Sequence, residues 1–294
     1  MLNAAATAGA TVPGWHPHFD VWLVMLLSAG GYLAALRYLG PKRVAPGEPV
    51  ATRRQMAYFL SGVAILWIGA DWPLHEVSEK FLFSAHMVQH TLFSLVAPPL
   101  LLLGIPAWLY RAIIDAAGLN KVVKLVTKPA VGLITFNLVI VGTHWPTVVG
   151  ISVHHHLAHF GLHVILFTAS VLMWWPVVDP LPEYSRLSPP GKMLYLFLQS
   201  ILPTVPASFL TFSDAPLYSF YAHAPRLWGL DAITDQRIAG LFMKIGGGLL
   251  LWLAIAILFF RWNAAEERSD AGEATEVSWE DFERELEAWE LRKT

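Results

Sequence analysis

Histidine is the residue whose placement along the chain points most directly to chemistry. The sequence of 294 residues contains twelve histidines and no cysteine. The lack of cysteine excludes disulfides, thiolate-bound zinc, iron–sulfur clusters and a CxxC copper shuttle. His86 and His90 are four residues apart, and so are His159 and His163. Because residues i and i+4 share one face of a helix, each pair can present two imidazoles in the same direction.

The two pairs could bind a transition metal if their helices face each other. Imidazole is a ligand for copper, zinc, iron and nickel, and thioether sulfurs favour Cu(I). Asp235 could be a further ligand, or an acceptor that orients an imidazole ring. The candidate metal ligands are His86, His90, His144, His159, His163, Met87, Asp235 and Met243.

Other interpretations of these residues remain open. A single histidine inside a membrane often does no more than hydrogen-bond to a neighbouring helix, and both methionines could simply be packing residues. His16 and His18 precede the first apolar segment, and at that position solvated surface residues are a simpler interpretation than metal ligands. At least one residue of the run 154–156 is expected to be solvated, while His75 and His223 fit either role.

The composition predicts a membrane protein. Hydrophobic residues make up 55% of the chain and charged residues only 14%, against ~25% in soluble domains. A helix needs roughly 20 apolar residues to cross the hydrocarbon core. Seven segments qualify, near residues 19–39, 56–73, 80–109, 130–149, 155–177, 192–212 and 237–261. We therefore predict an all-α, polytopic membrane bundle of about seven transmembrane helices. The third should kink or break in its second half, which contains Pro98-Pro99, Gly104 and Pro106.

Lysine and arginine predict the orientation of the bundle, because they concentrate in cytoplasmic loops. Eleven follow the first, third and fifth segments: Arg37, Lys42, Arg43, Arg53, Arg54, Arg111, Lys121, Lys124, Lys128, Arg186 and Lys192. Three lie on the other side: Lys80, Arg226 and Arg237. The N-terminus is therefore expected outside and the C-terminus in the cytoplasm, which places every histidine toward the outer side. The first apolar segment lacks a preceding positive region and is expected to be a retained helix.

Three regions are expected along the chain: an outer segment at residues 1–18, a seven-helix domain at 19–262, and an acidic cytoplasmic tail at 263–294. Half of the 22 acidic residues lie in this tail. Ser278 and Asp281 fit a capping box for a short amphipathic helix. That helix could be solvated, or it could dock onto a protein partner or onto the basic loops of the chain. No compact basic patch predicts nucleic-acid binding.

Several short motifs together resemble the CtaG family of the caa3 type, which are bacterial seven-span assembly factors of cytochrome c oxidase. The resemblance covers roughly residues 56–260. It begins with Phe83-Ser84-Ala85-His86-Met87-Val88-Gln89-His90, Ala97-Pro98-Pro99 and Leu103-Gly104-Ile105-Pro106. It continues through Asn137, His144-Trp145-Pro146, His159, His163, Trp174-Trp175-Pro176, Pro216-Leu217-Tyr218, Asp235-Gln236, Ala239-Gly240 and Met243. Two positions depart from the family pattern: Thr143 stands for a Trp, and Lys244 for another Trp.

The resemblance implies a non-enzymatic factor in the inner membrane of a bacterium, which supplies copper to cytochrome c oxidase subunits from a site on the periplasmic side. The alternative is a haem-b electron-transfer protein with one histidine of each pair as axial ligands. The absence of histidine from the cytoplasmic half argues against haems at both faces. A metal or proton channel is a third interpretation, weakened by the scarcity of carboxylates within the spans.

Overall fold

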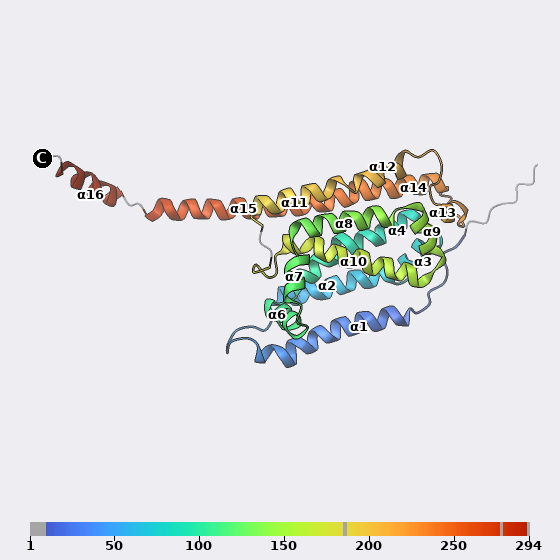
Figure 1. Ribbon diagram of the computed structural model, residues 1–294, viewed down its shortest axis with the longest axis horizontal. Coiled ribbons are helices and arrows are strands. Elements are labelled where there is room, and N and C mark those ends of the chain that lie inside the picture. The colour runs from blue at the N-terminus through green and yellow to red at the C-terminus, as the bar shows by residue number, and fades with distance from the viewer. Residues whose placement is uncertain (1–9, 185–186, 277–278, 293–294) are drawn as a thin grey trace, which may run out of the picture.

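The computed structural model describes residues 10–184, 187–276 and 279–292. Within these residues the chain is helical and contains no strand. The helices run side by side in a membrane bundle (Figure 1). Five are long and apolar enough to cross a membrane in the described part of the chain, or up to seven if two bent helix pairs each form one span. This confirms the predicted fold class, a polytopic helical membrane protein.

The first half of the bundle begins with α1 (Phe19–Ala34), which continues through a π-helical turn, η1 (Ala35–Leu39), and a 3₁₀ turn, η2 (Gly40–Lys42). Next come α2 (Arg53–Ala70) and the short α3 (Leu74–Lys80), bent by 42° from α2. A central span follows, made of α4 (Phe83–Thr91), the π-helical turn η3 (Leu92–Val96) and α5 (Ala97–Gly104). Two short helices, α6 (Ala107–Ala116) and α7 (Asn120–Val126), lie at the end of the bundle opposite α3 (Figure 1).

The second half contains α8 (Pro129–Thr143), α9 (Pro146–His154) and α10 (His156–Val178). The sixth span is α11 (Pro189–Ile201) with α12 (Thr204–Phe212), and a short α13 (Ser219–His223) follows. The last span joins α14 (Ala232–Leu241), the π-helical turn η4 (Phe242–Gly246) and α15 (Gly247–Glu276). Helix α16 (Trp279–Glu290) follows in the acidic tail. The predicted cap residue Ser278 lies outside the described residues.

Local sequence signals account for the helix starts. Thr52 and Gln55 form a capping box at α2, in which each side chain accepts from the backbone N–H of the other, at 3.1 and 2.9 Å. Asp231 accepts from the backbone N–H groups of Ile233 and Thr234 and caps α14. Such caps satisfy backbone donors that no helical carbonyl can reach.

The third span becomes irregular just before its prolines and ends soon after them. The π-helical turn η3 precedes Ala97-Pro98-Pro99, so the prolines lie in the first turn of α5. The helix then ends at Gly104, within the predicted second half of the span, because Ile105 adopts extended backbone ahead of Pro106. A π-helical turn inside an α-helix is uncommon and frequently marks a functional site.

Several polar residues are buried inside the bundle, while many large apolar side chains face outward. Gln89, Gln199 and Asp235 are almost fully buried, whereas large apolar side chains on α1 and α15 are exposed, among them Leu27 and Leu249. This arrangement suits a protein that lipid surrounds, because lipid solvates apolar side chains and cannot satisfy polar ones. The central span packs against α2, α10 and α14. Its residues are therefore positioned by three neighbouring elements.

Candidate functional site

Four histidines gather at the centre of the bundle, two from α4 and two from α10; we call His86, His90, His159 and His163 the histidine core. The ring centroids are 4.1 Å apart between His86 and His90 and 4.3 Å apart between His159 and His163. Across the two helices, His86 lies 5.7 Å from His159 and His90 lies 5.2 Å from His163. The i,i+4 spacing thus aligns each pair, and the packing of α10 on the central span brings the pairs together.

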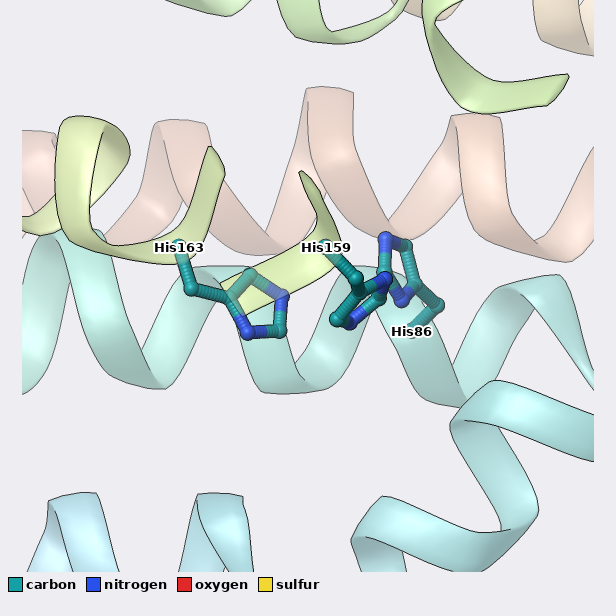
Figure 2. Close-up of side chains that lie close together, drawn as sticks. All are labelled: His86, His159 and His163. Atoms are coloured by element: carbon teal, nitrogen blue, oxygen red, sulfur yellow. The ribbon is translucent and has the colours of Figure 1, made fainter. Parts of the chain in front are cut away.

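Three of these side chains have the geometry of a metal site. One ring nitrogen from each of His86, His159 and His163 lies within 4.8 Å of the other two. Figure 2 shows His159 and His163 on one helix and His86 reaching toward them from the other. Figure 1 places α4 and the beginning of α10, which follows α9, toward the end of the bundle where α3, α9 and α13 lie. An ion between the three nitrogens would need only small side-chain movements.

The nitrogens of the histidine core are buried, and some lack hydrogen bonds. His86 and His159 are buried, and His90 and His163 are half-buried. Among the described residues, no hydrogen-bond partner contacts the buried His86 Nδ1, His90 Nδ1 or His163 Nε2. Leaving such a group unsatisfied costs about 1–3 kcal/mol. A bound cation is one way to satisfy these nitrogens.

A carboxylate lies at the edge of the histidine core. Glu79, from α3, places Oε1 3.1 Å from His159 Nε2 and Oε2 3.3 Å from His75 Nε2. Sequence reasoning did not select Glu79. The available signal was the four-residue spacing of His75 and Glu79 immediately before the motif that carries His86. That spacing puts both side chains on the face of α3 that turns toward α4.

His144 and the two methionines adjoin the histidine core. His144 Nδ1 donates to the carbonyl of Ile140 at 2.7 Å, which leaves Nε2 free of a proton and 3.4 Å from Met87 Sδ. The His144 ring lies 6.0 Å from that of His90. A cavity of about 50 Å³ opens beside them, lined also by Met243 and Lys244. Thus Met87, His144 and Met243 surround one side of the histidine core, as neutral nitrogen and sulfur donors.

Asp235, predicted to be a further ligand or an acceptor that orients an imidazole ring, contacts the backbone at the start of α4. It is almost fully buried and accepts hydrogen bonds from the backbone N–H groups of Phe83, at 2.7 Å, and Ser84, at 3.1 Å. It also accepts from the Ser84 hydroxyl. A carboxylate is favoured at this position by the helix dipole. Asp235 therefore ties α14 to the first turn of α4, which fixes the helix that carries His86 and His90.

Gln89 is a second residue that fixes this region, and it lies between the two histidines of α4. Its amide nitrogen donates to the carbonyl of Gly69 at 2.8 Å and lies 3.3 Å from His75 Nδ1. Its amide oxygen accepts from Ser78 at 3.0 Å. Gln89 therefore connects α2, α3 and α4 where they meet.

The remaining histidines fall into two groups. His154, His155 and His223 are exposed, and the side chain of His156 lies outside the described ones. The other group lies at the surface near α3 and consists of His16, His18 and His75. Here His16 and His18 join Glu76 in a second set of possible ligand atoms within 4.8 Å of one another. The sequence favours solvated side chains for His16 and His18 and does not indicate that they lie beside the buried carboxylate of Glu76.

Comparisons with known proteins identify relatives. The chain is 21% identical over 286 residues to an uncharacterized protein of Mycobacterium bovis and, equally, to one of Mycobacterium tuberculosis. In each case the match covers 90% of this chain and 42% of the relative, so the chain spans about two fifths of the length of the curated relatives it matches. No solved structure matches.

A family model described as the cytochrome c oxidase caa3 assembly factor matches residues 30–265, which include the histidine core, His144, Asp235 and Met243. The expectation drawn from the motifs of α4, α8, α10 and α14 is thereby confirmed. With four fifths of its length matched, the chain belongs to the Caa3_CtaG family of cytochrome c oxidase caa3 assembly factors.

Proposed function

We propose that this protein is a non-enzymatic assembly factor of the bacterial inner membrane, which binds a copper ion in the histidine core and delivers it to a haem–copper oxidase. The observation that supports this most is the approach of His86, His159 and His163, whose ring nitrogens lie within 4.8 Å of one another inside the bundle. The family supplies the oxidase as the partner.

Copper fits the donors better than other common metals do. The histidine core offers neutral imidazoles, and Met87 lies 3.4 Å from the nearby His144 Nε2. Imidazole and thioether together favour copper, and thioether favours Cu(I) in particular. Magnesium and calcium prefer oxygen ligands, and the only carboxylate at the edge of the histidine core is Glu79 among the described residues.

The distribution of charge supports delivery on the periplasmic side. The end of the bundle with α6 and α7 carries basic residues such as Arg111 and Lys124, which are typical of cytoplasmic loops. The histidine core lies toward the opposite end. Helix α1 begins at that opposite end and α15 leaves at the basic one (Figure 1), as an odd number of crossings requires.

The haem-b alternative is less compatible with the packing. Axial ligation would place a porphyrin between imidazoles of α4 and α10. His90 and His159 pack beside the rings of His86 and His163, in the space that the porphyrin would have to fill. A macrocycle would have to separate the two helices.

The test is copper binding by the full chain purified in detergent. We expect copper to co-purify or to bind stoichiometrically, to be lost in His86→Ala and His163→Ala, and to be retained in the control His223→Ala, which changes an exposed histidine. Membranes of cells that express only the first two variants should contain oxidase deficient in copper. A Soret band in place of copper would support the haem alternative, and absence of copper under both oxidising and reducing conditions would refute the proposal.

A further inference from the structure

A second group of ligand atoms lies at the surface of the same end of the bundle. His16 Nε2 is 2.7 Å from Glu76 Oε1, and His18 Nε2 is 3.5 Å from the same oxygen. The two imidazole rings are 4.8 Å apart. Glu76 is buried, His18 is half-buried and His16 is exposed. We call His16, His18 and Glu76 the outer site.

The residues of the outer site are held in place from several directions. The N-terminal segment that carries both histidines is anchored by Trp72, whose Nε1 donates to the carbonyl of Pro13 at 3.0 Å. The N–H of Ala10 donates to the carbonyl of Arg226 at 3.1 Å. Val12 packs against the apolar cluster around Val77. The segment is therefore docked across α3 rather than loosely placed near it.

Asp71 orients one of the two imidazoles. The Nδ1–H of His18 donates to Asp71 Oδ1 at 2.8 Å. The Nε2 of His18, on the other side of the ring, is directed toward Glu76. Asp71 is itself held by the indole N–H groups of Trp22 and Trp67, at 2.7 and 3.0 Å. A carboxylate that fixes the distal nitrogen of a histidine is the arrangement found behind histidine ligands of protein-bound metals.

The chemistry of the outer site differs from that of the histidine core. Two imidazoles and one carboxylate are the protein ligands of several zinc enzymes, and imidazole with carboxylate oxygen also suits Cu(II). Lys80 occupies the other oxygen of Glu76, with Nζ 2.6 Å from Oε2, and leaves Oε1 to face the imidazoles. Lys80 is exposed and can turn away into solvent. The set is therefore suited to a divalent cation.

A continuous series of side chains joins the outer site to the histidine core. The ring of His75 lies 5.3 Å from that of His18. On its other side, His75 Nε2 is 3.3 Å from Glu79 Oε2, and Glu79 Oε1 is 3.1 Å from His159 Nε2. His159 belongs to the histidine core. Imidazole and carboxylate donors thus follow one another from the surface into the bundle.

We propose that the outer site binds a divalent transition-metal cation, Cu²⁺ or Zn²⁺, and that His75 and Glu79 pass the ion on to the histidine core. Binding at the outer site stands independently. The passage inward rests on the proposed function, because it requires the histidine core to bind metal. No change of oxidation state is part of the transfer.

The stoichiometry of Cu²⁺ bound to the full chain in detergent tests the outer site. Wild type and the control His223→Ala should bind two ions. His16→Ala/His18→Ala should bind one, and His86→Ala/His163→Ala should bind the other. The single variant His16→Ala alters an exposed side chain and should weaken one site by ~10-fold or more. Electron paramagnetic resonance should show nitrogen and oxygen donors at the site that His86→Ala/His163→Ala retains.

The outcomes separate the two proposals. Two ions of unchanged affinity in His16→Ala/His18→Ala would overturn the outer site. If wild type binds one ion and only His86→Ala/His163→Ala removes it, the outer site would also be overturned, and the proposed function would stand. One ion that only His16→Ala/His18→Ala removes would support the outer site and refute the histidine core as a metal site.

Glu79→Gln tests the passage between the sites. This variant should still bind two Cu²⁺ ions at equilibrium, but stopped-flow absorbance should show the histidine core filling ~10-fold or more slowly. An unchanged rate of filling would refute the passage through Glu79. The outer-site variant His16→Ala should slow filling as well at low Cu²⁺ concentration, and His223→Ala should not.

Discussion

The histidine core and the outer site differ in burial and in the charge of their donors. The histidine core is built from neutral imidazoles inside the bundle, and its ring nitrogens include several without hydrogen bonds. The outer site contains the anionic Glu76 and is oriented by a second carboxylate, Asp71. A neutral donor set does not require a particular ion charge, so it accepts Cu(I) as well as Cu(II). A carboxylate favours the divalent ion, because the attraction grows with the charge of the cation.

This contrast implies a division of work. The surface site selects by charge, and the buried interior site accepts copper in either oxidation state. Four substitutions, ordered from the largest expected effect to the smallest, would break or sharpen the contrast.

The double substitution His86→Ala/His163→Ala should have the largest effect. This variant removes two of the three imidazoles whose nitrogens lie within 4.8 Å of one another. Cu(I) binding should weaken by more than ~100-fold, which exceeds the effect of losing a residue that only orients a metal ligand. Competition with a chromophoric Cu(I) chelator measures this. The outer-site variant His16→Ala/His18→Ala is the matched control and should leave Cu(I) affinity unchanged. Equal losses in the two variants would mean that the sites do not differ as described.

Asp71→Asn should act on the outer site alone. An amide cannot accept from Trp22, Trp67, His18 and the Trp72 backbone in the way a carboxylate does, so His18 should lose its fixed orientation. We expect Cu²⁺ or Zn²⁺ binding at the outer site to weaken by about 10- to 100-fold, measured by calorimetry in the background of His86→Ala/His163→Ala. Unchanged affinity would show that Asp71 only anchors the N-terminal segment.

Met87→Leu should weaken the preference of the interior for Cu(I). Leucine conserves volume, a swap that usually costs less than ~1.5 kcal/mol of stability, and removes the sulfur 3.4 Å from His144 Nε2. We expect Cu(I) affinity to fall by up to about tenfold, 1.4 kcal/mol, with Cu²⁺ affinity much less affected. A similar fall for both ions would place Met87 among packing residues only.

Asp235→Asn should have the smallest effect on metal and a measurable one on stability. If Asp235 caps α4, the substitution should lower the free energy of unfolding by about 0.5–2 kcal/mol, seen as a lower Tm in detergent. Copper stoichiometry should stay unchanged. Loss of a copper ion without a change in Tm would restore Asp235 to the metal ligands.

The residues of the histidine core could be predicted because their pairing follows from local sequence spacing. Two i,i+4 pairs on apolar segments specify which faces the imidazoles share, and the family motifs indicate that these faces meet. The same holds for the number of spans, since each is a run of apolar residues. The spacing of His16 and His18, by contrast, carries no such signal, because their ligand environment comes from Glu76 and Asp71, more than fifty residues away.

Two further features depended on tertiary contacts that no local pattern encodes. Asp235 sits among residues that resemble a metal motif, but its oxygens reach the start of α4, over 150 residues earlier in the chain. Glu79 lies on a helix too short for a span. Its four-residue spacing from His75 places both on one helix face, but that spacing does not show that α3 bends by 42° from α2 and brings Glu79 to His159. The bend turns its side chain toward α10, and a bend of this kind follows from packing.

Helix α15 has a consequence for the tail that follows it. Its thirty residues, at ~1.5 Å each, make a rod of about 45 Å, longer than the ~30 Å hydrocarbon layer. Because α15 begins beside the interior cavity, its second half extends well past the neighbouring helices (Figure 1). The rod therefore holds its own C-terminal half clear of the bundle, as a helical spacer between the membrane domain and the tail.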